Sequence, residues 1–107
     1  MILNWFNTRE VDEFAQLVVD ELLKRYPPDG KYFELKKSTE RLRKTHDFIF
    51  ARVNTFAKSA KLNTYKIAHL GTQAKWALKE AGYPKEFVET FVLELVSVVT
   101  TQARKRG

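Results

Sequence analysis

The sequence contains no cysteine, and this absence excludes a disulfide framework and a zinc site built on thiolates. Glycine and proline are also scarce, with four and three residues in a chain of 107. Such a low content is atypical of β-barrels and β-sandwiches, which need many turns. No apolar run approaches the roughly 18 residues that a transmembrane helix requires, so we expect no contact with a membrane.

The residues that are present are typical of one folded domain spanning residues 1–107. Apolar residues make up 44% of the chain and aromatic residues 13%, which argues against intrinsic disorder. The apolar start, Met1–Phe6, is too short for a signal peptide and lacks its basic region. We therefore expect a cytoplasmic protein.

Four segments carry apolar residues at the three- and four-residue spacing of amphipathic helices. They predict helices at about residues 8–25, 38–61, 64–81 and 84–104. Asn63 or Thr64 is a suitable N-cap for the third helix, and Gly82 is suited to end it. Residues 31–37 fit either an extended segment or an early helical turn. The predicted fold is all-α, a compact antiparallel bundle of about four helices.

The first three helices each have an apolar stripe that predicts the core. In the first helix the stripe is Val11, Phe14, Ala15, Val18 and Leu22. In the second helix it is Leu42, His46, Ile49, Val53, Phe56 and Ala60. In the third helix it is Ile67, Leu70, Gly71, Ala74 and Leu78, whose small members predict close approach of another helix.

Positive charge is concentrated in the middle of the chain. The whole protein has a net charge of +6, whereas residues 1–30 carry a net charge of −3 and residues 31–61 a net charge of +6. On the second helix one arc of roughly 80° carries four cations and an aromatic ring. Its members are Lys37, Arg41, Lys44, Phe48 and Arg52. This stripe predicts either a solvated helix face or a surface that binds the phosphates and bases of RNA or DNA.

The third helix has a second face whose side chains combine an apolar body with a polar atom. Its members are Tyr65, His69, Thr72 and Trp76. Such side chains are typical of ligand pockets and protein interfaces. The alternative is a central helix that is buried on both faces.

The fourth helix has an apolar arc of about 180°, wider than the roughly 100° that one core-facing side requires. Either the helix is sandwiched among the other three, or a homodimer or another protein partner covers the excess. If the protein is monomeric, we expect the excess to be buried within the bundle under Met1–Phe6. The candidate interface residues are those at the two edges of the arc. They are Val92 and Val96 on one side, and Phe87 and Val98 on the other.

Catalytic chemistry has little to rest on in this sequence. There is no His-Glu-x-x-His pattern and no glycine-rich phosphate loop, and His46 is interpreted as a core histidine. We predict no enzyme, no catalytic residue, no metal ligand and no cofactor. The first hypothesis is a small interaction protein that self-associates through its last helix. The alternatives are a nucleic-acid-binding module and, third, a small-molecule or enzyme site near Tyr65, His69 and Trp76.

Overall fold

The structure is a computed structural model that describes residues 7–28 and 36–106, with side chains over 7–28 and 40–105. It contains the helices α2 (Arg9–Arg25), α4 (Lys36–Ser59), α5 (Thr64–Ala81) and α6 (Lys85–Arg106). Within the described residues, all regular secondary structure is helical, which confirms the all-α prediction. Helix α4 begins two residues earlier than the sequence predicts, and α6 extends two residues further. Met1–Phe6 and residues 31–35 lie outside the described part of the chain.

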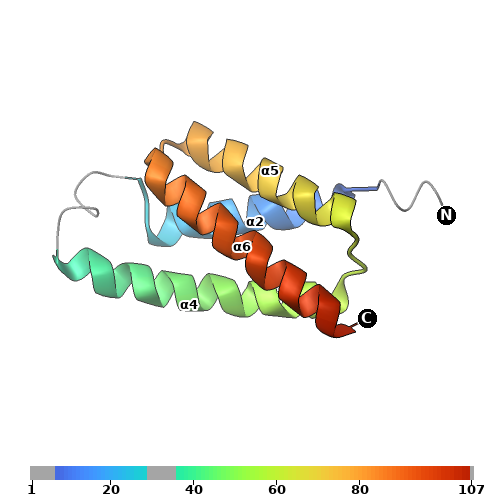
Figure 1. The fold of residues 1–107 in the computed structure, drawn as a ribbon. Coiled ribbons are helices and arrows are strands. Elements are labelled where there is room, and N and C mark those ends of the chain that lie inside the picture. Colours follow the sequence, from blue (N-terminus) through green and yellow to red (C-terminus); the bar gives the residue numbers. More distant parts are fainter. Residues whose placement is uncertain (1–6, 29–35, 107) are drawn as a thin grey trace.

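Successive helices run in opposite directions, so α2 is parallel to α5 and α4 is parallel to α6 (Figure 1). Helix α5 packs against α2 and α6, and α4 packs against α6 and less extensively against α2. The order around the bundle is therefore α2, α4, α6 and α5. Helices α4 and α5 are consecutive in the chain, yet they stand at opposite corners of the bundle.

The core forms where the apolar stripes of the four helices meet. The stripe predicted for α2 is buried throughout, from Val11 to Leu22. In α4 the prediction is only partly correct, because His46 and Phe56 are half-buried whereas Phe50 is buried. For Phe50 and Phe56 the physical reason is that α4 packs mainly on α6. Its buried stripe is turned toward that helix, where Phe50 meets Phe91 edge to face at 5.5 Å between ring centroids.

The ends of α5 are set by the two residues that the sequence singles out. The Asn63 side chain accepts a hydrogen bond from the backbone N–H of Lys66 at 2.8 Å. At the other end Gly82 has a φ of 100°, a left-handed conformation that residues with a Cβ rarely adopt. These two caps fix where α5 begins and ends. Between them the helix packs against α2 and α6.

A buried tyrosine ties the turn between α5 and α6 to the end of α2. The Tyr83 hydroxyl donates a hydrogen bond to the backbone carbonyl of Tyr26 at 2.7 Å. Burial, with a smaller contribution from Tyr26, raises the pKa of Tyr83, so its hydroxyl remains protonated and can donate. The contact therefore closes the end of the bundle where α2 stops and α6 starts.

Gly71 sets the distance between α5 and α6. A Cβ placed on Gly71 would lie 2.8 Å from a methyl carbon of Val96 and 3.8 Å from one of Val92. The shorter distance is below any normal contact between carbon atoms. Valine has one strongly preferred rotamer in a helix, so Val96 cannot easily turn away. The close approach predicted for this face of α5 is therefore present, and glycine is required for it.

We expect Gly71→Ala to lower the free energy of unfolding by about 1 kcal/mol. Overpacking opposes the native contact by about 1–3 kcal/mol, whereas alanine favours a helix over glycine by roughly 1 kcal/mol. In a Val96→Ala background the steric conflict is gone, so the same change should be stabilising. Urea denaturation of the four proteins measures both effects, with Thr72→Ala on the exposed side of α5 as control. An equal effect in both backgrounds would contradict the contact.

Candidate nucleic-acid interface

Three cations and one aromatic ring gather where α4 passes the end of α2. Together with Lys44, which is exposed on the same stripe of α4, they form a set that we call the basic surface. It consists of Arg25, Arg41, Lys44, Phe48 and Arg52. The three cations on α4 are exposed. The Nε atom of Arg41 donates a hydrogen bond to the backbone carbonyl of Arg25 at 2.9 Å. The last carbonyls of a helix carry partial negative charge, so the end of α2 favours cations at this place.

Two guanidinium groups of the basic surface converge on the ring of Phe48. The guanidinium carbon of Arg25 lies 3.6 Å from the ring centroid, and that of Arg52 lies 4.9 Å away. The Nε of Arg25 also donates to the Glu21 carboxylate at 3.0 Å. A guanidinium that stacks on a ring still presents N–H donors along its edge. The ring therefore holds two like charges close together, and Glu21 neutralises only one of them.

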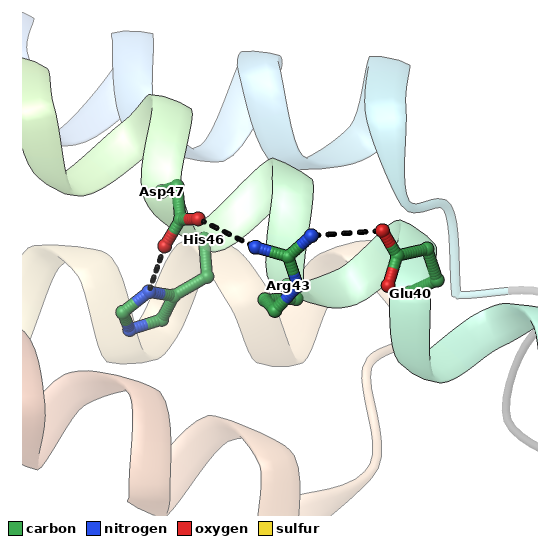
Figure 2. A network of polar contacts seen from close by, with 4 residues as sticks. All are labelled: Glu40, Arg43, His46 and Asp47. Atoms are coloured by element: carbon green, nitrogen blue, oxygen red, sulfur yellow. Dashed lines mark hydrogen bonds and ion pairs between the residues drawn. The ribbon is translucent and has the colours of Figure 1, made fainter.

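The acidic side chains of α4 are engaged on another part of the helix. Figure 2 shows Arg43 between Glu40 and Asp47, with N···O distances of 2.8 and 3.3 Å. The hydrogen bond and charge of Arg43, aided by the charge of Lys44, lower the pKa of Glu40. The sequence of α4 contains no further acidic residue. Its acids are thus paired with Arg43, while Arg41 and Arg52 lie toward α2.

The structure brings together most of the predicted stripe and adds one residue to it. Arg41, Lys44 and Arg52 are exposed as expected, and the side chain of Lys37 lies outside the described part. Phe48 is half-buried, so its ring is not the open stacking platform that the sequence suggested. Sequence reasoning missed Arg25, although a basic residue in the last turn of α2 is the signal that could have found it.

His46 joins α4 to α6 at the side where Arg43 is paired. Its Nε2 atom lies 2.6 Å from a carboxylate oxygen of Glu94, and its ring stacks on Phe50 with 4.3 Å between centroids. The imidazole is 35% exposed. His46 is therefore a hydrogen-bonded histidine at the edge of the core. A small pocket of about 150 Å³, bordered by Phe87 and Phe91, lies beside this pair.

The second face of α5 is open to solvent. Tyr65 is 42% exposed and Trp76 is 56% exposed, and Thr72 is also exposed. His69 pairs with Asp12 of α2, with 2.7 Å between its Nε2 atom and a carboxylate oxygen. The interpretation of a central helix buried on both faces is therefore wrong. The reason is that α5 packs on only two neighbours, which leaves its outer side uncovered.

Both edges of the apolar arc on α6 are partly covered within the chain. Val92 and Val96 face Gly71 of α5, and Phe87 stacks on neighbouring aromatic rings. Val98 is half-buried against the core. Residues of the bundle thus cover part of the apolar arc for which we expected a partner. Self-association through α6 stays a prediction.

The described residues contain no group of three or more histidine, cysteine or acidic side chains arranged to hold a metal ion. None of the helices in this part of the chain is long and apolar enough to span a membrane. Comparison of the sequence with protein-family models and curated proteins, and of the fold with solved structures, finds no match.

The contact between His46 and Glu94 should stabilise the protein measurably. In a double-mutant cycle with His46→Ala and Glu94→Ala we expect a coupling free energy of about 0.5–1.5 kcal/mol, because the pair is partly shielded from water. The exposed pair Gln16 and Asp20 on α2 is the control, with an expected coupling of about 0.2–0.5 kcal/mol. Thermal or urea denaturation provides the free energies. A coupling no larger than the control would contradict a structural role for the pair.

Proposed function

We propose that the protein binds nucleic acid through the basic surface. The observation that carries this proposal is the convergence of Arg25 and Arg52 on Phe48. Two like charges held near each other repel, and a bound anion would relieve that repulsion. Phosphate, like carboxylate, matches the fork of N–H donors on a guanidinium.

The distribution of the cations supports a polyanion rather than a single small anion. Arg41 and Arg52 are 11 positions apart on α4, which corresponds to roughly 16 Å along the helix axis. One strand of a duplex presents a phosphate about every 3.4 Å along the duplex axis, so this length spans several phosphates. Lys44 lies between the two arginines in the sequence and extends the positive field. The protein's overall charge of +6 acts in the same direction.

Self-association through α6 is a second candidate, and one observation favours it. Leu93 is 69% exposed, the largest exposed fraction among the exposed large hydrophobic side chains of the described residues. It lies outside the apolar arc, and its helical neighbours four positions away are Glu89 and Ser97. A partner that covered Leu93 would remove a leucine from water, which contributes about 25 cal/mol for each Å² buried.

Binding to labelled DNA or RNA should be detectable by fluorescence anisotropy at about 50 mM salt and should weaken steeply as salt increases. We expect the double variant Lys44→Gln/Arg52→Gln to bind more weakly at every salt concentration. For each phosphate that the variant no longer neutralises, the slope of log K against log salt should fall by roughly 0.7–0.9. The matched control is Lys75→Gln/Lys85→Gln, which removes the same charge from α5 and the start of α6. An undetectable interaction of the parent protein at this salt would refute the proposal.

If α6 meets a second copy of the chain through Leu93, light scattering should show a mass that increases with protein concentration. Leu93→Glu should then give a folded monomer, because the charge would be buried only in the dimer. Leu23→Glu on α2 is the control, since Leu23 is also exposed and lies on another helix. A parent protein that is monomeric at high micromolar concentration would exclude this candidate.

A further inference from the structure

An apolar groove lies beside the basic surface, between α2 and α4. Its volume is about 520 Å³. Phe14 and Phe56 stack within its lining, with 4.0 Å between ring centroids and 2° between ring planes. Leu17 stands at the side of α2 and is 40% exposed. The groove therefore offers apolar and aromatic surface that the protein leaves in contact with water.

The groove and the basic surface are continuous because they share two residues. Phe48 and Arg52 line the groove and also belong to the basic surface. A molecule that fills the groove thus meets apolar side chains along its length and a guanidinium at its rim. This combination fits a ligand with a flat apolar part joined closely to an anionic part.

A nucleotide of a single strand has that composition. Its base presents a π-face that stacks on or packs against apolar side chains, and its phosphate is close to the base. In a duplex the bases are paired and stacked inside the helix, so a base enters a groove on a protein surface only after unpairing and unstacking, at a cost of a few kcal/mol. A groove that takes a base would therefore discriminate between the two forms, whereas the cations alone would not.

We infer that the groove between α2 and α4 takes an unpaired base, and that the protein prefers single-stranded nucleic acid over a duplex. The inference rests on the proposed function, since the same cations hold the backbone. A substitution at Leu17 tests base binding separately from phosphate binding, because Leu17 lies in the groove and carries no charge.

Three labelled ligands of equal length test this inference by fluorescence anisotropy. They are an oligothymidine strand, its duplex with oligodeoxyadenosine, and a strand of abasic sites that keeps the phosphates without the bases. We expect the oligothymidine to bind at least fivefold more tightly than the other two. An oligouridine strand in the same assay distinguishes RNA from DNA.

The variant Leu17→Ser should weaken binding of oligothymidine by at least threefold and leave binding of the duplex and the abasic strand unchanged. The matched control is Leu23→Ser, because Leu23 lies on the same helix with 37% exposure but does not line the groove. Ala51→Leu, which fills the groove from α4, is the second variant if Leu17→Ser is poorly folded by circular dichroism. The same decrease in oligothymidine affinity is expected for it.

The outcomes distinguish the inference from the proposed function. Equal binding of all three ligands, with no effect of Leu17→Ser or Ala51→Leu, overturns base binding in the groove and leaves phosphate binding in place. Tighter binding of the duplex also overturns it. Absence of binding to every ligand removes the proposed function and the inference together.

Discussion

The close approach of α5 and α6 at Gly71 is the constraint on which the rest of the bundle depends. Because no side chain separates the two helices there, Val92 and Val96 reach the surface of α5 and one edge of the apolar arc is covered. The other side of α6 is then directed toward α4, where Glu94 meets His46. The absence of a side chain at Gly71 of α5 therefore helps to determine which residues of α6 face α4.

Because the buried stripe of α4 faces α6, the charged side chains of α4 are divided between two sides of the helix. Arg43 pairs with both acidic residues of the helix, and His46 on the same side pairs with α6. Arg41 lies instead at the end of α2, where its Nε atom donates to a backbone carbonyl that attracts cations. Electrostatic segregation of this kind does not require selection for a ligand. It produces a positive surface whose acidic neighbours include Glu21, paired with Arg25, and Glu40, near Lys44. The surface that we propose to bind nucleic acid therefore results from the way the helices pack.

The prediction of the fold rested on the helical periodicity of apolar residues and on capping residues, which are local properties of the sequence. The buried stripe of α2, the cap at Asn63 and the turn at Gly82 follow from residues at most four positions apart. The arrangement of the helices around the core does not follow from them. The fourth helix has an apolar arc of the same width whether a partner chain or two neighbouring helices cover it. For this reason the sequence alone does not show how much of the arc α5 and the aromatic neighbours cover, and self-association through α6 stays a prediction.

The candidate site shows the same division between local and long-range information. The cations on α4 could be read from helical spacing, because they belong to one element. The contribution of Arg25 and the covering of Phe48 depend on how α2 crosses α4, and no pattern in either helix encodes that crossing. The pairs of His46 with Glu94 and of His69 with Asp12 span 48 and 57 positions. At such separations nothing in the sequence indicates that a histidine and a carboxylate are partners.

The hydrogen bond from Tyr83 to Tyr26 has a consequence for the order in which the chain can fold during its synthesis. The two residues are 57 positions apart, so the end of α2 obtains its donor only after residue 83 has been made. At about 5–20 residues per second, translation of that stretch takes roughly 3 to 11 seconds. Until α5 emerges, the side of α2 that it will cover lacks its neighbour among the described helices. Helix α2 is synthesised before α4, α5 and α6, yet it is among the last of these helices to be fully enclosed. A nascent chain therefore exposes the valines of α2 to chaperones or to other chains for several seconds.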